Sequence, residues 1–272
     1  MNLIYAGIIA CFSLMSCNSE APPTYNDPLP KYDSFQIQSV PLQEERKINV
    51  WTPDNYNNTS DSFIVLYMAD GGTQEDFPHI ANTLASLIAA KKIPPIILVG
   101  IENTNRRRDL SGPSSVKEDE KVAPLSDGAA QFRAFINDEL FSAIQSKYRT
   151  KVQKGIIGES LSGLFVMETF LLKPEMFDYY IAMDPSFWWN NGFLVKNAPT
   201  ILSKHNDEQP KKLWFAGSNA KDISKYTKEF SKTLEATKQP NLTWQYSDEP
   251  KEKHNTIFRA TKEKALIWTF GM

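Results

Sequence analysis

One short segment of this chain, Gly158-Glu159-Ser160-Leu161-Ser162-Gly163, has the residue types and spacing of a turn that carries a serine nucleophile. It follows an apolar stretch ending in Ile156-Ile157 and precedes a run with helical spacing, and a nucleophile elbow is such a strand–turn–helix connection. The turn needs small residues two positions before and after the nucleophile, which Gly158 and Ser162 provide. We therefore predict that Ser160 is a nucleophile, in preference to a simple helix N-cap, which Ser also favours.

A serine nucleophile needs a base, and the chain has only three histidines. His79 precedes Ser160, and His205 lies far from any predicted strand end that would face it. His254 follows the last predicted strand by a short loop, in the chain order nucleophile, acid, base. His254 is therefore the predicted general base.

The acid that would orient this histidine is less determined by the sequence. Asp222 lies shortly after the predicted strand 212–216 and is our candidate, although it is equally suited to cap the helix that begins at Ile223. Glu249 and Glu252 lie close to His254 in sequence and are alternatives, as is a Ser–His dyad without an acid.

An oxyanion formed at the attacked carbonyl requires two backbone N–H donors. The residue after the nucleophile, Leu161, should supply one of them. The turn Ala69-Asp70-Gly71-Gly72 follows an apolar strand and has the flexible backbone that can approach a substrate, so Gly72, or its neighbour Gly71, is predicted to supply the other.

A long charged loop, Asn103–Pro124, contains three consecutive arginines. Arg106 and Arg108 suit bidentate recognition of an anionic or catecholate substrate, but pairing with Asp109 to hold the loop explains them equally well. Trp188, in an adjacent tryptophan pair, is a further candidate to line a ligand cleft.

The elements that must position these residues alternate between β-rich runs and helical patterns, which indicates an α/β fold with a mostly parallel sheet covered by helices on both faces. The predicted strands are 34–40, 46–51, 63–68, 96–101, 154–157, 179–183, 212–216 and 242–246. The predicted helices are 76–90, 129–148, 161–172, 223–237 and 261–270. The strands 63–68 (FIVLYM) and 96–101 (IILVGI) are continuously apolar, which predicts burial on both faces.

Composition excludes several classes of protein. A formal net charge of -2, from 30 basic and 32 acidic residues, gives no field that would attract nucleic acid. Both cysteines, Cys11 and Cys17, lie in the first seventeen residues, so we expect no disulfide framework. Because the chain has only three histidines and no cysteine beyond position 17, we expect neither a metal site nor a cofactor.

The N-terminal segment has the features of a targeting signal. Residues 3–14 (LIYAGIIACFSL) form an apolar run too short to span a bilayer, and the sequence Leu14-Met15-Ser16-Cys17 resembles a bacterial lipoprotein signal. We therefore expect a signal peptide over 1–16, lipidation at Cys17, a Pro-rich tether over 17–33 and a single domain over 34–272. This organisation predicts a membrane-anchored lipoprotein of the bacterial cell envelope.

Taken in order, several segments resemble the putative esterase family, which includes esterase D and the enterochelin esterases. They are VLYMADGG (65–72), GIENTNRRRDL (100–110), FINDELFSAIQSKYRT (135–150), GESLSGLF (158–165), DPSFWW (184–189) and HNTI (254–257). The resemblance implies an α/β-hydrolase fold and metal-free cleavage of carboxylic esters by Ser160 and His254. Two positions depart from the family pattern, because Glu159 stands where His is usual and Asp184 where Ser commonly precedes Pro-Ser.

The expected function is therefore hydrolysis of an ester at the cell envelope, on a small molecule such as a siderophore lactone or on an acyl group linked to a glycan. The alternative is a non-catalytic envelope lipoprotein that binds a siderophore or glycan in the same cleft.

Overall fold

A computed structural model describes residues 26–205 and 209–271 of the chain. The predicted signal peptide and the predicted lipidation site, Cys17, lie outside these residues, as does the tether up to residue 25. None of the helices within the described ranges is long and apolar enough to cross a membrane.

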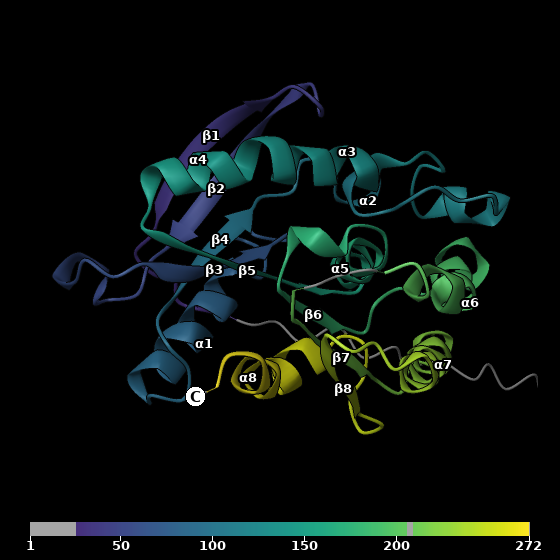
Figure 1. The fold of residues 1–272 in the computed structure, drawn as a ribbon. Coiled ribbons are helices and arrows are strands. Elements are labelled where there is room, and N and C mark those ends of the chain that lie inside the picture. The colour runs from purple at the N-terminus through teal and green to yellow at the C-terminus, as the bar shows by residue number, and fades with distance from the viewer. Residues whose placement is uncertain (1–25, 206–208, 272) are drawn as a thin grey trace, which may run out of the picture.

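An eight-stranded sheet forms the centre of the molecule, with the strand order β1-β2-β4-β3-β5-β6-β7-β8 (Figure 1). The strands are β1 (Asp33–Ser39), β2 (Glu44–Trp51), β3 (Phe63–Met68), β4 (Ile96–Ile101), β5 (Thr150–Glu159), β6 (Tyr179–Met183), β7 (Lys211–Gly217) and β8 (Leu242–Asp248). β2 is antiparallel to both β1 and β4, and all the other pairs are parallel. The carboxyl ends of β3 to β8 therefore meet at one edge of the sheet, where ligands bind in open α/β sheets.

Helices cover both faces of the sheet (Figure 1). On one face lie α1 (Phe77–Ala89) and α8 (Ile257–Phe270), which contact each other and the strands beneath them. The other face is covered by α3 (Gly128–Phe135), α4 (Phe141–Lys147), α5 (Leu161–Leu172), α6 (Trp189–Leu202) and α7 (Lys221–Thr237). This arrangement confirms the predicted fold class.

Complete burial of the central strands explains why they are apolar throughout. Every residue of β4 is buried, and β3 is buried except for the partly exposed Ile64. Alternate side chains of these strands belong to two separate hydrophobic clusters, one on each face of the sheet. A strand buried on both sides shows no alternation of polar and apolar residues.

Three regions differ from the sequence-based expectation. The helix expected over 129–148 is interrupted by a π-helical turn, η3 (Ile136–Leu140), between α3 and α4. The long charged loop contains a short helix, α2 (Arg106–Asp109), and a 3₁₀ turn, η2 (Lys117–Lys121). α6 was not predicted at all.

Two further 3₁₀ turns are η1 (Tyr56–Asn58) and η4 (Pro174–Met176).

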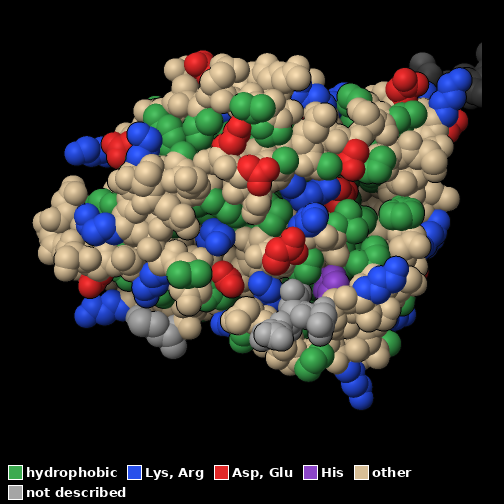
Figure 2. All heavy atoms as spheres, turned by 45° about the horizontal axis from the view of Figure 1, so that its top comes forward, with side chains coloured by type: hydrophobic (Ala, Val, Ile, Leu, Met, Phe, Trp, Pro, Cys, Tyr) green, Lys and Arg blue, Asp and Glu red, His purple; other side chains and the backbone are tan. Residues whose placement is uncertain are grey.

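Charged side chains are mixed over the face drawn in Figure 2, where acidic and basic groups alternate with apolar patches. This face therefore carries no large patch of a single charge.

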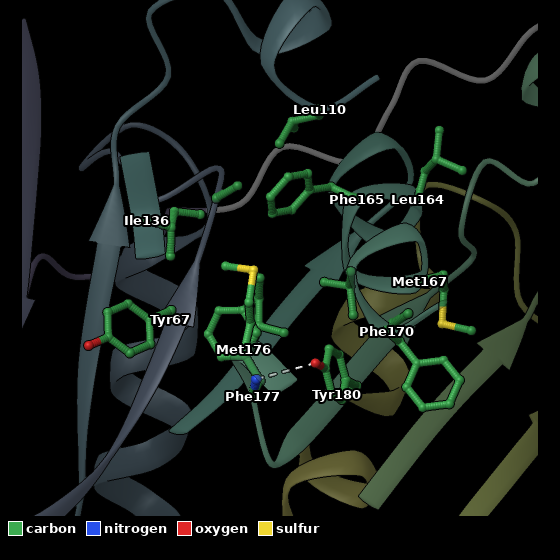
Figure 3. Packing of buried hydrophobic residues seen from close by; sticks show 14 of the residues in the cluster. Tyr67, Leu110, Ile136, Leu164, Phe165, Met167, Phe170, Met176, Phe177 and Tyr180 are labelled. Carbon is green, nitrogen blue, oxygen red and sulfur yellow. Dashed lines mark hydrogen bonds between the residues drawn. The ribbon is translucent and has the colours of Figure 1, made fainter. Parts of the chain in front are cut away.

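The helix behind the candidate nucleophile is held firmly by the core. All of α5 from Leu161 to Leu171 is buried. Its rings Phe165 and Phe170 pack as Figure 3 shows, Phe170 edge-on to Tyr180 at 5.3 Å between ring centres. Tyr180 in turn accepts a hydrogen bond from the backbone N–H of Phe177 at 3.2 Å. Close packing on every side fixes the start of α5 relative to the sheet.

Candidate active site

Ser160 lies in a strained turn between β5 and α5, with φ 59° and ψ -118°. A residue with a side chain adopts such a conformation at a penalty of roughly 1–3 kcal/mol, which the buried strand and helix on either side must sustain. Gly158 shows why the turn needs small residues, since a Cβ atom there would lie 2.6 Å from the backbone of Ser162. The turn therefore has the geometry of a nucleophile elbow.

His254 lies next to this serine, in the loop between β8 and α8. Its Nε2 atom is 3.0 Å from Ser160 Oγ, and its Nδ1 atom is 2.8 Å from Asp184 Oδ2. Three side chains from the ends of β5, β6 and β8 thus form one hydrogen-bonded line. In this arrangement an imidazole can take a proton from the hydroxyl while the carboxylate holds it in the required tautomer.

Asp184 is completely buried and makes several hydrogen bonds. Its Oδ1 accepts the backbone N–H of Ser218 at 2.6 Å, and its Oδ2 accepts the Ser218 hydroxyl at 2.6 Å as well as His254. Its backbone has φ 44°, and its N–H donates to the carbonyl of Ala216 at 3.0 Å. These contacts fix the carboxylate against the imidazole.

The acid predicted from the sequence was Asp222, and the structure places a different carboxylate against Nδ1. Asp222 is the second residue of α7, and Asp184 takes the orienting position. Of the two alternatives, Glu249 pairs with Lys264, and Glu252 accepts the hydroxyl of Thr256 at 2.7 Å. The candidate acid is therefore Asp184, and the prediction of Asp222 was wrong.

The sequence did contain a signal for this residue. Asp184 directly follows β6, and β6 lies beside β5 in the sheet. The end of β6 therefore lies nearer the nucleophile than the end of β7, where the acid was sought.

The hydrogen bond from His254 to Asp184 raises the pKa of the imidazole above its ordinary value of 6.5, despite the opposing effect of burial. Negative charge on Asp184 and Asp222 acts in the same direction. The base is thus more readily protonated than a free histidine.

The predicted oxyanion donors have different surroundings. Leu161 is the first residue of α5, where a backbone N–H has no acceptor within the helix. The N–H of Gly72 instead donates to the Glu75 carboxylate, with 2.6 Å between nitrogen and Oε2. Glu75 also accepts from Asn103 at 2.8 Å, and burial raises its pKa. Gly72 can serve an oxyanion only if Glu75 moves away, so its role stays a prediction.

Both candidate arginines are engaged within the protein. Arg106 binds both oxygens of Asp70, at 2.5 and 2.8 Å, in the turn that contains Gly72. Arg108 binds Glu44 of β2 at 2.6 and 3.2 Å and Asp109 at 2.7 Å. These contacts favour the structural explanation for the arginine run.

The candidate Trp188 is half-buried at the start of α6 and packs against the core. Its neighbour Trp189 donates its indole N–H to the carbonyl of Gly112 at 3.0 Å. The next residue, Asn190, has left-handed backbone and donates its N–H to Asp119 at 2.8 Å. The tryptophan pair is thereby tied to the long charged loop.

Among the described residues, no group of three or more His, Cys, Asp and Glu side chains could hold a metal ion.

The sequence model of one protein family, described as putative esterase, matches residues 39–270. The chain belongs to the putative esterase family. A Bacillus subtilis relative, the ferri-bacillibactin esterase BesA, is 33% identical over 138 residues, which are 45% of this chain and 48% of that protein. The siderophore triacetylfusarinine C esterase of Aspergillus fumigatus is 26% identical over 172 residues, 60% of this chain and 57% of that protein. The chain thus spans about half the length of the curated relatives it matches.

A solved structure, the IroE-like serine hydrolase from Shewanella oneidensis, superposes with a TM-score of 0.80 at 25% identity. The match covers 88% of this chain and 79% of that one. The likeness in fold to this hydrolase thus extends over nearly the whole described chain.

The two residues that depart from the esterase family pattern both lie at the site. Asp184 contacts His254, as described above. Glu159 Oε1 lies 3.6 Å from Nε2 of the same histidine, and burial raises the pKa of Glu159 to about 8. Sequence reasoning noted both departures and assigned a role to neither.

Proposed function

We propose that this protein is a serine carboxylic-ester hydrolase. The observation that carries the proposal is the line from Ser160 Oγ through His254 to Asp184, with hydrogen bonds of 3.0 and 2.8 Å, at a strained strand-to-helix turn. Membership of the putative esterase family supports the same reaction.

The reaction follows from this geometry. Ser160 Oγ attacks the ester carbonyl carbon while its proton passes to His254 Nε2, and the carbonyl oxygen becomes an oxyanion near the N–H of Leu161. The carbon–oxygen bond to the alcohol then breaks, and Nε2 returns the proton to the departing oxygen. Water attacks the acyl-enzyme in the same way, Nε2 takes its proton, and Ser160 regains a proton as the acid leaves.

The substrate class we propose is an ester of a siderophore, with a carbohydrate-linked acyl group as the other candidate. The support comes from the two relatives described above, which are siderophore esterases. Arg106 and Arg108 contribute little to this choice, because both are paired with carboxylates of the protein.

The decisive test uses purified wild-type protein, Ser160→Ala, His254→Ala and the double variant. Substrates are a p-nitrophenyl ester, a catecholate trilactone and a feruloylated sugar. Each single variant should lose as much kcat as the double, up to ~10⁶-fold, because the two residues act as one unit. Wild-type rates in folded Ser160→Ala protein would refute the proposal. The trilactone and the sugar ester distinguish the two substrate classes, and ligand binding without turnover would indicate a non-catalytic binding protein.

Covalent labelling gives an independent check. A fluorophosphonate should label Ser160, and His254→Ala should block the reaction because the hydroxyl then has no base. Ser186→Ala is the matched control, since that hydroxyl lies 3.4 Å from Ser160 Oγ. Labelling that disappears only in Ser186→Ala would show that the wrong serine was chosen.

We also propose that the protein is lipidated at Cys17 and held at the cell envelope, on the strength of the sequence around that residue. In a bacterial host, Cys17→Ala should abolish incorporation of labelled fatty acid and release the protein from membranes. Cys11→Ala should leave both unchanged. Membrane association that persists in Cys17→Ala would contradict the anchor.

A further inference from the structure

A small cavity of about 160 Å³ adjoins the catalytic histidine proposed above. Glu159 at the end of β5 and His254 form one wall. The other walls come from Asp76 and His79 near the start of α1 and from Phe258 and Arg259 in α8.

The backbone of Glu159, which lines this cavity, is held in place by Ser162. Its backbone N–H donates to Ser162 Oγ at 2.8 Å, and the Ser162 hydroxyl donates back to its carbonyl at 2.8 Å. The side chain is 18% exposed, and its Oε1 is 3.6 Å from His254 Nε2. That distance is too long for a hydrogen bond, so Nε2 remains committed to Ser160 at 3.0 Å.

The reaction requires the alcohol part of the ester to lie close to His254 Nε2. When the ester bond breaks, Nε2 must donate its proton to the departing oxygen, which therefore lies within about 3 Å of Nε2. Glu159 Oε1 lies 3.6 Å from the same Nε2 atom, so the first carbons of the alcohol and the Glu159 carboxyl are neighbours of one histidine nitrogen. The cavity that both residues line is the nearest space for them.

We propose that this cavity is the subsite for the alcohol part of the ester, and that Glu159 selects alcohols with a hydroxyl or amide group next to the scissile oxygen. This inference rests on the proposed esterase function.

The charges around the cavity favour a neutral polar group. The charged groups that act on Glu159 are His254, Asp76, Arg106 and Asp184. Asp76 pairs with His79 at 2.9 Å, and Arg106 pairs with Asp70.

On the α8 side, Arg259 pairs with Asp27 at 3.0 Å. Lys262 Nζ lies 3.3 Å from Nδ1 of His79, whose pKa is lowered by burial. Each charged side chain around the cavity is thus already engaged by another group of the protein. Burial raises the pKa of Glu159 to about 8, so at neutral pH its carboxyl can both donate and accept.

The volume limits the size of the group. At ~30 Å³ for each water molecule, the cavity holds the equivalent of about five waters, which suits a short alcohol chain with one or two polar substituents. The ring of Phe258, edge-on to His79 at 4.9 Å, gives it an apolar side.

A pair of esters with one acyl group tests the assignment. Glyceryl monobutyrate and propyl butyrate share the acyl group and the three-carbon alcohol chain, so they form the same acyl-enzyme and differ only in the hydroxyls of the alcohol. Wild-type protein should favour the glyceryl ester in kcat/KM. Glu159→Leu should lower that preference about tenfold, the value of one hydrogen bond, whereas Glu159→Gln, which keeps a donor and an acceptor, should retain it within about threefold.

Two further variants complete the experiment. Asp222→Asn removes a charge that acts on His254 without altering the cavity wall, so it should leave the preference unchanged. Phe258→Trp narrows the cavity and should lower kcat/KM for both three-carbon esters while sparing methyl butyrate. If Glu159→Leu changes both esters equally, or if Phe258→Trp affects methyl butyrate as strongly, the subsite assignment is overturned.

Different results would refute the esterase function and the alcohol subsite. Wild-type protein that hydrolyses no butyrate ester and takes up no fluorophosphonate would refute that proposal. Protein that takes up the label but does not hydrolyse glyceryl monobutyrate would refute the subsite alone.

Discussion

Replacing Asp184 by Asn should inactivate the enzyme through the tautomer of His254, and the surrounding hydrogen bonds determine how. Ser218 donates its backbone N–H to Oδ1 at 2.6 Å, and a backbone N–H always needs an acceptor. The Asn carbonyl must therefore take the Oδ1 position. The amide NH₂ then takes the Oδ2 position, 2.8 Å from His254 Nδ1.

An NH₂ group facing Nδ1 donates to it, so the imidazole proton moves to Nε2. Nε2 then points a hydrogen at Ser160 Oγ and can no longer accept the serine proton. In a serine protease the same replacement lowers kcat by about 10⁴, which is about 5 kcal/mol of transition-state stabilisation. We expect a loss of that order for Asp184→Asn.

The assay is kcat for a p-nitrophenyl ester, together with the melting temperature to show that the variant is folded. Asp222→Asn is the control, and it should stay within about threefold of wild type because Asp222 influences His254 only through its charge. Folded Asp184→Asn protein within tenfold of the wild-type rate would refute the tautomer argument, as would a larger loss in Asp222→Asn.

Three more outcomes follow from charges near the site. Because the pKa of His254 is raised above 6.5, kcat/KM should be lost as pH falls through a midpoint above 6.5, and a pH–rate profile with a lower midpoint would contradict this. Glu159 has a pKa of about 8 in the folded protein, against 4.5 in the unfolded chain. Between these two pH values the folded state holds a proton that the unfolded state releases. The free energy of unfolding should therefore fall as pH rises from 4.5 to 8, by at most about 5 kcal/mol. Glu159→Gln should therefore melt at the wild-type temperature at pH 4 and above it at pH 9; equal differences at both pH values would argue against the shift. Asp109→Asn removes the fully buried one of the two carboxylates that pair with Arg46 and leaves only Glu44, at 2.7 Å. It should therefore lower the free energy of unfolding in urea, by up to about 3–5 kcal/mol, with little change in kcat. A kinetic defect without loss of stability would instead favour substrate binding by Arg106 and Arg108.

The elements best predicted from the sequence are those whose burial is complete. β3, β4, β6 and α5 have the predicted bounds, because nearly all of their residues are buried and most of them are apolar. α6 escaped prediction for the opposite reason. Its first turn contains left-handed residues at 190–192, and Pro199 lies inside it, so neither its start nor its interior has a helical sequence pattern.

Some residues of the candidate site could likewise be predicted from the sequence, and others could not. Ser160 is recognisable from its neighbours in sequence, and His254 from its place after the last strand. The orienting acid was missed because it was sought after β7, whereas β6 is the neighbour of β5 in the sheet, and the pairing of strands is not visible in the sequence. Nor could the sequence show that Arg106 and Arg108 already bind Asp70 and Glu44, since these partners are distant in the chain.

The contact between Asp184 and Ser218 has a consequence for how such sites change over evolutionary time. β6 and β7 run in parallel register, with Met183 opposite Ala216, so the residues that follow them lie about one strand spacing apart, ~4.8 Å. Ser218 Oγ donates to the same Oδ2 atom of Asp184 that His254 contacts, so the side chain at position 218 lies one hydrogen bond away from the imidazole. The ends of β6 and β7 are thus two neighbouring positions from which an acid side chain can approach this histidine. Related enzymes can thus share a reaction while taking this one residue from different strands.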